Sequence, residues 1–453
     1  MCFVPVVSFF LLFLQKKINM KTKHVLIIAC IFSIFVPARV VAQDFIKEVS
    51  VKVDSGSIIR TIDADEWMIY SFYENRVSFT LVNESITTAL VLKFPLAEDG
   101  FYVVNDFEIL NDSVYFCGYK ENWQGLKTAI FGYFALAGFP TTNVYYYAVA
   151  GISNFDKMDL YDDEGHPHVV MIGDALHQAQ VIVDTREVGL NHWIFDIADY
   201  SYQSELLDIR FDDVAVTDDY VFVTSRGLYD GIVYIQEFAK PASYSSIFIG
   251  NIAVFPISLY NASPVLIEHC YDNYYSILTS IDDNKIIVGF YNEYGCLSQY
   301  ETTRDYFHCR DLKVNSICPE TVDVLLKISD INGNVWSEII TSVSMQTPGN
   351  KPIVISVHKY PDHDIYSMDF VAPQDNIIAS GQPEQGGELY VYRCYRNEWN
   401  CEEEESTFFV KSFNPTVPWP FEIVTMIVDL YANQIKCGEE VVNVQTKCKQ
   451  QER

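Results

Sequence analysis

The feature that most constrains this chain is an internal repeat of about 50 residues, which runs from about Asp63 to Arg393. Each copy opens with a polar step and an alternating strand, turns tightly at Asp or Asn, and continues into a β-branched or aromatic strand. The strands after the turn are Trp67–Ser71, Val114–Cys117, Val169–Ile172, Tyr220–Thr224, Ile286–Val288, Val322–Leu326 and Ile377–Ser380. These copies recur at a mean step of about 51 residues, which is typical of four-stranded propeller blades.

The segments around these strands favour the same architecture. The preceding strands alternate with period two, as in Asp106-Phe-Glu-Ile-Leu, Asp213-Val-Ala-Val and Asp369-Phe-Val-Ala. Third strands follow in several copies, such as Thr128–Phe134 and Glu388–Arg393. We therefore predict an all-β fold, a single β-propeller of about seven four-stranded blades, with six or eight blades as alternatives.

Closure of such a ring requires that its two ends be fastened together. The alternating stretch Phe45–Val53 is predicted to add a strand to the last blade, with Phe408–Phe413 or Phe421–Leu430 as its partner. The propeller would then span residues 43–453. Copy five fits poorly, because it keeps a strand at Ser276–Ile281 ahead of Ile286 but lacks the leading Asp.

One copy reads Asp112-Ser-Val-Tyr-Phe-Cys-Gly118 followed by Ile130-Phe-Gly-Tyr-Phe134. This pattern resembles a blade core of the secreted β-propeller proteins of unknown function of the Bacteroidales type. The resemblance implies an exported propeller and transfers no catalytic residues. The sequence lacks the Trp-Asp pairs of WD40 blades and the repeated double Gly of kelch blades.

Residues 1–42 have the pattern of a signal region. Its parts are a basic start at Lys21 and Lys23, an apolar run at Val25–Val36 and a small-residue cleavage site at Val40–Ala42. Met20 directly precedes this pattern, so we expect translation to start there and cleavage to occur near Ala42. The alternative is a lipoprotein signal that ends at Cys30. An exported chain would lie in the periplasm, at the cell surface or outside the cell, and no later stretch reaches the ~20 apolar residues that span a bilayer.

The chain is strongly acidic, with a formal net charge of −29 at pH 7. Removing residues 1–42 removes five basic and no acidic residues, which takes the charge to about −34. Such a chain repels polyanions and anionic surfaces, so we exclude nucleic acid and anionic membranes as partners. The charge serves solubility, or it attracts cations and neutral polar ligands.

Nine cysteines follow the signal region, and an exported chain permits disulfides. Their spacing suggests the pairs Cys394–Cys401, Cys437–Cys448 and Cys296–Cys309. Connectivity does not follow from sequence alone, and the odd count leaves at least one thiol over. We expect Cys117, which lies inside a strand pattern, to be a buried free thiol.

The main candidate site is a set of acids that lead the strands before the turns: Asp106, Asp159, Asp213 and Asp369. The innermost strands of a propeller line its central channel, so these acids could form a ring that holds Ca²⁺ or a polar ligand. The alternative, which we favour, is that each Asp accepts backbone hydrogen bonds in its own loop and stabilises its blade. We expect no other cofactor.

Three further groups have both a chemical and a structural interpretation. A metal pair is suggested by His166 and His168, beside Asp162, Asp163 and Glu164, with His177 nearby. An acid–base pair is suggested by Asp362, His363 and Asp364 with His358. Sugar stacking is suggested by Tyr145–Tyr147, Tyr271, Tyr274, Tyr275 and Trp399. Turn and strand-packing roles are favoured for all three groups.

The sequence contains no Gly-x-Ser-x-Gly element, phosphate loop or dinucleotide fingerprint. We therefore expect an exported, non-catalytic binding or interaction protein that holds a protein or carbohydrate on loops of one propeller face. The first alternative is a polysaccharide hydrolase or lyase, with two carboxyl groups about 5 to 9.5 Å apart over the channel. The second is a structural partner at the cell envelope, which would present a broad apolar patch.

Overall fold

The computed structural model of this chain describes most of the repeat region. The described residues are 45–53, 56–84, 89–163, 165–175, 180–189, 192–199, 209–217, 219–227, 233–239, 251–257, 264–271, 274–281, 285–292, 295–303, 306–314, 321–330, 332, 334–343, 353–361, 363–371, 376–384, 386, 388–395, 406–413, 423–432 and 435–445. All of them belong to one compact unit, Phe45–Arg453. The predicted signal region lies outside the described residues.

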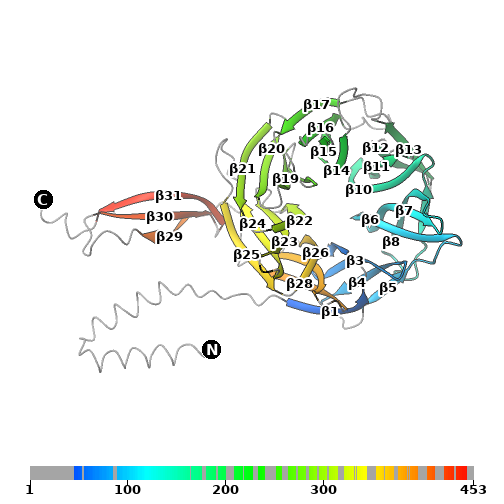
Figure 1. The fold of residues 1–453 in the computed structure, drawn as a ribbon, viewed down its shortest axis with the longest axis horizontal. Coiled ribbons are helices and arrows are strands. Elements are labelled where there is room, and N and C mark those ends of the chain that lie inside the picture. The colour runs from blue at the N-terminus through cyan, green and yellow to red at the C-terminus, as the bar shows by residue number, and fades with distance from the viewer. Residues whose placement is uncertain are drawn as a thin grey trace, which may run out of the picture. The chain divides into compact units, whose positions relative to one another are not determined.

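Seven small antiparallel sheets of four strands stand in a ring and form a seven-bladed β-propeller (Figure 1). The prediction of an all-β propeller with about seven blades is therefore confirmed. Within blades 1 to 6, neighbours in the chain are neighbours in the sheet. The first strand of each blade lies at the central channel, which residues of these strands line, and we call it the inner strand. The fourth strand lies at the rim and is the outer strand.

The strands of blades 1 to 3 are β2 (Ser57–Asp63), β3 (Glu66–Tyr73), β4 (Arg76–Asn83), β5 (Leu90–Lys93), β6 (Gly100–Leu110), β7 (Ser113–Asn122), β8 (Lys127–Ala135), β9 (Tyr145–Ala148), β10 (Ile152–Asp163), β11 (His166–Ala175), β12 (Gln180–Gly189) and β13 (His192–Asp199). Those of blades 4 and 5 are β14 (Ile209–Val216), β15 (Tyr220–Gly227), β16 (Val233–Ala239), β17 (Asn251–Ile257), β18 (Leu266–Tyr271), β19 (Tyr274–Ile281), β20 (Lys285–Asn292) and β21 (Gly295–Thr303). Those of blades 6 and 7 are β22 (Tyr306–Val314), β23 (Thr321–Ser329), β24 (Val335–Val343), β25 (Ile353–Pro361), β26 (His363–Val371), β27 (Asn376–Pro383) and β28 (Glu388–Tyr395).

The amino-terminal strand β1 (Phe45–Lys52) supplies the fourth strand of blade 7, as the sequence predicted. Its partner, however, is β28, rather than Phe408–Phe413 or Phe421–Leu430. Blade 7 already has three strands of its own, so only one outer position is open. Val49 and Val53 fill that position by packing with Leu389 and Val391 of β28. The later segments lie in a separate three-stranded sheet of β29 (Ser406–Phe413), β30 (Ile423–Ala432) and β31 (Ile435–Gln445).

Copy five was assigned one strand too late in the sequence analysis. Ile286–Val288 lies in β20, the third strand of blade 5, and the second strand is β19. Tyr274–Ile281 and Lys285–Asn292 are both apolar and adjacent in sequence, so the repeat pattern alone does not distinguish them. The inner strand of blade 5 is therefore β18, and its acidic residue is Glu268.

A β-bulge recurs in the inner strands of blades 2, 3, 4, 6 and 7. In β6 the register shifts between Val104 and Asp106. A Cβ atom added to Gly118, opposite the bulge, would lie 2.1 Å from the carbonyl oxygen of Val103. The equivalent Gly173 in blade 3 meets the same obstacle. The close approach of the bulged backbone therefore requires glycine at these two positions, in blades 2 and 3.

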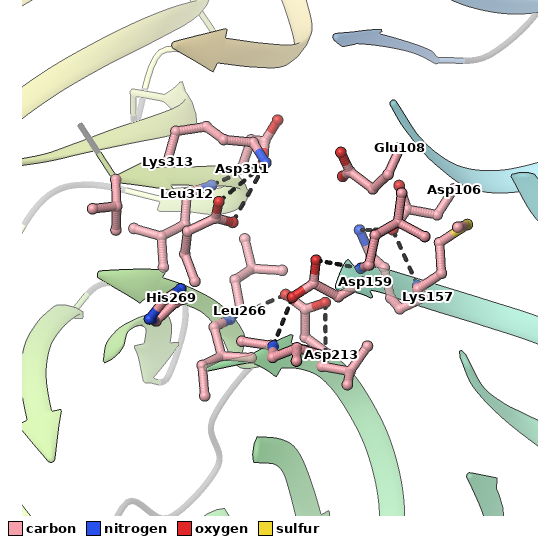
Figure 2. A pocket seen from close by; sticks show the side chains of 18 of the residues that line it. Asp106, Glu108, Lys157, Asp159, Asp213, Leu266, His269, Asp311, Leu312 and Lys313 are labelled. Atoms are coloured by element: carbon pink, nitrogen blue, oxygen red, sulfur yellow. Dashed lines mark hydrogen bonds and ion pairs between the residues drawn. The ribbon is translucent and has the colours of Figure 1, made fainter. Parts of the chain in front are cut away.

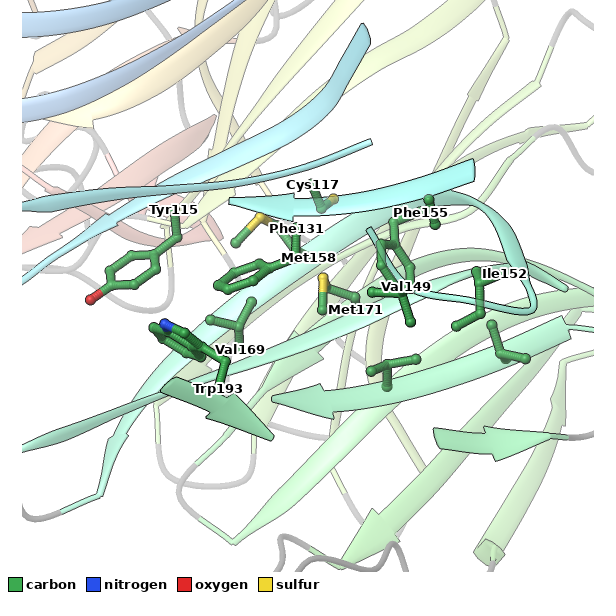
Figure 3. Close-up of a cluster of buried hydrophobic side chains, with 13 residues drawn as sticks. Tyr115, Cys117, Phe131, Val149, Ile152, Phe155, Met158, Val169, Met171 and Trp193 are labelled. Atoms are coloured by element: carbon green, nitrogen blue, oxygen red, sulfur yellow. The ribbon is translucent and has the colours of Figure 1, made fainter. Parts of the chain in front are cut away.

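The core lies between successive blades, where sheet faces pack against each other. Between blades 2 and 3, Phe131 and Met171 are fully buried and Trp193 packs edge-on against Phe131 at 4.8 Å between centroids (Figure 3). Cys117 lies in the same cluster as a fully buried free thiol, as predicted. Each blade thus buries its apolar faces against its neighbours, which is what the repeat requires for stability.

The side chains of Cys296, Cys394, Cys401, Cys437 and Cys448, five of the six cysteines in the predicted disulfides, lie outside the described residues, so these pairings stay predictions. Within the described part of the chain, no helix is long and apolar enough to cross a bilayer.

Candidate functional site

The central channel is lined by charged side chains at two levels of the inner strands (Figure 2). The first level directly follows the bulge and holds Asp106, Lys157, Asp213, Asp311 and Ser367. The second level lies two residues further and holds Glu108, Asp159, Ala215, Lys313 and Asp369. Residues two apart on a strand point the same way, so both levels face the channel. The residues between them, such as Phe107 and Met368, are fully buried in the blade cores.

The predicted acids therefore lie together on the channel but at two positions of the repeat rather than one. Asp106 and Asp213 follow the bulge, whereas Asp159 and Asp369 lie two residues later. The sequence analysis assigned all four acids to one position of the repeat. The extra residue of a β-bulge cannot be recognised from the alternation of polar and apolar residues.

Five of the channel carboxylates each join their own blade to the next one around the ring. In each, Oδ2 accepts a backbone N–H from the following inner strand. The donors are Met158 for Asp106 (3.4 Å), Val216 for Asp159 (2.6 Å), Ile267 for Asp213 (3.0 Å), Met368 for Asp311 (2.9 Å) and Thr61 for Asp369 (2.6 Å). In the first four, Oδ1 also accepts the N–H of the next residue in its own strand. The carboxylates thus act as fixed links between neighbouring blades, whereas the structural alternative expected backbone hydrogen bonds within the loop of each Asp.

Three basic side chains share the channel with these acids. Arg60 of β2 donates from Nε to Glu108 at 2.6 Å and from Nη2 to Asp106 at 3.1 Å. Lys157 Nζ lies 3.7 Å from Asp106, and Lys313 Nζ lies 3.4 Å from Glu268. The cations therefore offset part of the negative charge of the channel. Acids still outnumber bases among the lining residues.

Burial in the channel changes the pKa values of several of these carboxyl and amino groups. Burial raises the pKa of Asp159 to about 7, that of Asp213 to about 6 and that of Glu268 to about 8. Burial also raises the pKa of Glu108, against the opposing effect of Arg60. Burial alone would lower the pKa of Lys313, but the carboxylates of Glu268 and Glu108 raise it above its ordinary value. Some of the channel carboxyls therefore hold protons near neutral pH.

The cavity between these side chains has a volume of ≈ 350 Å³. Among the described residues, no three or more His, Cys, Asp or Glu side chains converge as a metal site would require. The sequence analysis missed Glu108, Glu268 and Asp311. Glu108 and Asp311 stand in short alternating patterns, Asp106-Phe-Glu108 and Asp311-Leu-Lys313, and a search for charged residues of either sign in alternate positions would have found them.

In neither of the two histidine clusters do the described side chains converge as a metal site would require. His168 is buried, and its Nδ1 lies 2.9 Å from the Tyr161 hydroxyl and 3.3 Å from Asp184, whereas His166 is exposed at the start of β11. In the second cluster, Asp364 pairs with Lys327 at 2.6 Å, and His363 Nδ1 contacts the carbonyl oxygen of Pro361. His177 and Asp362 lie outside the described residues.

The predicted aromatic groups have packing roles where they are described. Tyr145 and Tyr146 of β9 are exposed, but their rings pack on Tyr133 and Tyr102 at 5.2 and 5.0 Å. Tyr147 stacks on Phe131. The side chains of Tyr271, Tyr274, Tyr275 and Trp399 lie outside the described residues.

A second cavity, of ≈ 480 Å³, opens where the inner strands begin; we call it the mouth pocket. Its lining includes Phe72, Asn75, Phe101, Asn105, Glu121, Arg310 and Tyr366. The rings of Phe72 and Phe101 lie 6.1 Å apart, and Trp123 continues the row at 6.0 Å from Phe101. The Trp123 side chain is 61 % exposed. Sequence reasoning missed this pocket because its residues come from four blades.

Comparisons with known proteins add the following findings. No protein-family model matches the chain, and no curated protein matches its sequence. Among solved structures, an uncharacterized protein from Listeria monocytogenes is similar at 11 % identity and a TM-score of 0.42, over 80 % of this chain and 100 % of that one. The WD40 domain of a Toxoplasma gondii coronin is similar at 6 % identity and a TM-score of 0.46, over 79 % of this chain and 88 % of that domain.

Proposed function

We propose that this chain is an exported, non-catalytic binding protein that holds its ligand on one face of the propeller. The observation that carries the proposal is the use of the channel carboxylates. Asp159 and Asp213 each accept one backbone N–H from the next blade and one from their own strand. A carboxylate whose two oxygens are held by fixed donors is poorly placed to attack a substrate or to take a proton from water.

Export and location are part of the same proposal. They are supported by the signal pattern of residues 1–42 and by the resemblance to secreted propellers of the Bacteroidales type. The strongly negative net charge of −29 supports a neutral or cationic partner rather than nucleic acid. The face on which the inner strands begin is favoured for the ligand, because the mouth pocket opens there with unoccupied polar groups and the exposed ring of Trp123 lies beside it.

The test is a thermal-shift series with product analysis. Purified protein is heated with each member of a panel of soluble glycans, peptides and divalent cations, and the ligand is then recovered and sized. A ligand that binds only the folded state must raise the midpoint in a concentration-dependent way. We expect such a rise with the ligand unchanged. A ligand recovered in shortened or eliminated form would contradict a non-catalytic role.

A second candidate is a polysaccharide hydrolase or lyase that uses the channel. The observation that favours it is the pair of carboxyl groups Glu268 and Glu108, whose pKa values are raised by burial in one cavity, that of Glu268 to about 8. A carboxyl group that is protonated near neutral pH is suited to general-acid work. Release of reducing ends or unsaturated products by the wild type, with loss in Glu268→Gln, would support this candidate over the first.

A structural role at the cell envelope would be supported by one broad apolar patch. The exposed large apolar side chains of the described residues lie instead on several blades, such as Leu90 in blade 1, Ile197 in blade 3 and Val357 in blade 6.

A further inference from the structure

The mouth pocket combines aromatic rings with polar groups that can still form hydrogen bonds. Phe72 and Phe101 line the pocket, and the exposed Trp123 lies next to Phe101, so a row of three rings runs from the pocket lining to the surface beside it. On the opposite side, Tyr366 of blade 7 lies under the guanidinium group of Arg310, whose Cζ is 5.8 Å from the ring centroid. A ligand with one apolar and one polar side could therefore contact both walls.

Asn105 offers an acceptor whose orientation is fixed by its other contacts. Its Nδ2 donates to the carbonyl oxygen of Phe155 and to Oδ1 of Asn154, both at 2.7 Å. Because the Phe155 carbonyl can only accept, the amide nitrogen of Asn105 must face it, and Oδ1 is left for a different donor. In the described part of the chain, Asn105 Oδ1 receives no hydrogen bond.

The other polar groups complete a set of donors and acceptors. Arg310 donates from Nη2 to Asp364 at a long 3.5 Å, which leaves its remaining N–H groups for a ligand. Asn75 makes no side-chain hydrogen bond to any described residue. Glu121 has one weak partner, Lys127, at 4.0 Å. The pocket therefore presents both donors and acceptors, and a hydroxyl group, which donates and accepts at once, satisfies such a set.

Charge narrows the class of ligand further. One acid and one base, Glu121 and Arg310, line the pocket, so its local charge is balanced. The whole chain carries −29, which repels anionic glycans, nucleotides and acidic peptides at long range. A neutral, hydroxyl-rich ligand is compatible both with the balanced charge of the pocket lining and with the negative net charge of the chain.

We infer that the mouth pocket binds a neutral carbohydrate, with sugar rings stacked on Phe101 and Trp123 and hydroxyl groups bonded to Asn75, Asn105 and Arg310. This inference rests on the proposed binding function and names its ligand. The axial C–H groups of a sugar ring carry slight positive charge and suit the negative face of an aromatic ring. The ≈ 480 Å³ volume lies within the range of small-molecule sites and suits a short stretch of glycan.

The test is native gel electrophoresis of the purified protein in gels that contain xylan, galactomannan, mixed-linkage β-glucan, xyloglucan or dextran, together with an array of neutral glycans. Polygalacturonate serves as the anionic comparison and tryptic casein peptides as the peptide comparison. We expect at least one neutral glycan to retard or bind the protein, and polygalacturonate to have no effect.

Variants then locate the site. Trp123→Ala removes an exposed ring, and Asn75→Gly removes an amide at a residue with φ of 59°, which glycine tolerates, so both should fold. We expect each to weaken the Kd for the retained glycan about tenfold or more, as loss of a stacking or hydrogen-bonding partner would. Tyr145→Ala, an exposed ring of blade 2 outside the pocket, is the matched control and should bind as the wild type does.

The outcomes separate the inference from the function on which it rests. Absence of binding to every neutral glycan, or equal glycan binding by Trp123→Ala and the wild type, would overturn the carbohydrate site. Binding of casein peptides alone would overturn the carbohydrate site, but it would agree with the proposed binding function. Shortened glycan chains in the gel lanes would overturn the non-catalytic function itself.

Discussion

The Oδ2 atom of Asp311 in blade 6 accepts the backbone N–H of Met368 in blade 7 at 2.9 Å. The same oxygen accepts the Ser367 hydroxyl at 2.8 Å, and Oδ1 accepts the N–H of Leu312. The carboxylate therefore holds two inner strands that share no β-ladder. Four further acids make the same link elsewhere around the channel, so the ring is held at its centre by side chains as well as by apolar packing between blades.

Asp311→Ala should destabilise the protein by about 1–3 kcal/mol or more, because it leaves several donors near the channel without their acceptor. Asp311→Asn keeps one acceptor oxygen and should cost less. The measurement is the free energy of unfolding in urea. Glu384→Ala, at an exposed position, is the control and should lie within about 0.5 kcal/mol of the wild type. An alanine variant as stable as this control would contradict the linking role.

The raised pKa values of the channel carboxyls predict a fall in stability from about pH 5 to pH 9. Asp213, Asp159 and Glu268 titrate in the folded state at about 6, 7 and 8, above their values of about 4 in an unfolded chain. The folded state therefore binds more protons, and the stability that they provide is present at low pH and lost as pH rises through these values.

The midpoint of thermal unfolding, measured at intervals across this range, checks the prediction. Glu268→Gln removes one of the titrating groups, while Lys313 keeps the carboxylates of Glu108 and Asp311 nearby. The variant should show a shallower fall above pH 7 than the wild type. Parallel curves for the two proteins would show that Glu268 does not titrate in this window.

Gly118→Ala should be strongly destabilising, because the added Cβ would lie 2.1 Å from the carbonyl oxygen of Val103 and the bulged strand would have to move. Overpacking of this kind costs about 1–3 kcal/mol. Gly125, in the turn between β7 and β8, has open space around it and φ of 81°. Gly125→Asn is the matched control, since Asn tolerates this conformation, and its midpoint should stay close to that of the wild type.

Val49→Asp should open the ring where blade 7 receives β1. Val49 is 2 % exposed and packs with Leu389 and Val391, so an unpaired carboxylate there would be costly. Limited proteolysis should then cut the amino-terminal strand much faster than in the wild type. Lys52→Ala, at an exposed position on the same strand, should leave the rate unchanged. Equal rates for Val49→Asp and the wild type would argue against closure by β1.

The sequence predicted the fold well because each copy carries its own pattern of alternation, turn and apolar strand. The same pattern in Phe45–Val53 correctly predicted the closing strand, although its partner strand, β28, was not predicted. Strand pairing between chain ends depends on which edge is left open in three dimensions. Copy five shows the limit of a repeat search, because two apolar strands that closely follow each other in the sequence, β19 and β20, are interchangeable in such a search.

The site was less predictable for a physical reason. The four acids Asp106, Asp159, Asp213 and Asp369 were correctly placed on one channel, since alternation fixes which way an inner strand points. The backbone N–H groups that these acids bind could not be predicted, because each donor lies more than 50 residues away in the sequence. The mouth pocket draws on blades 1, 2, 6 and 7, and no local pattern marks Phe101, Asn105 or Arg310 as neighbours.

The most direct test of the whole account is a crystal structure of the protein with the oligosaccharide that it retains most strongly. The account predicts density for intact sugar rings against Phe101 in the mouth pocket and against Trp123 beside it, with the channel carboxylates still bonded to backbone N–H groups of the next blade. Density for a cleaved sugar between Glu108 and Glu268 in the central cavity would contradict it.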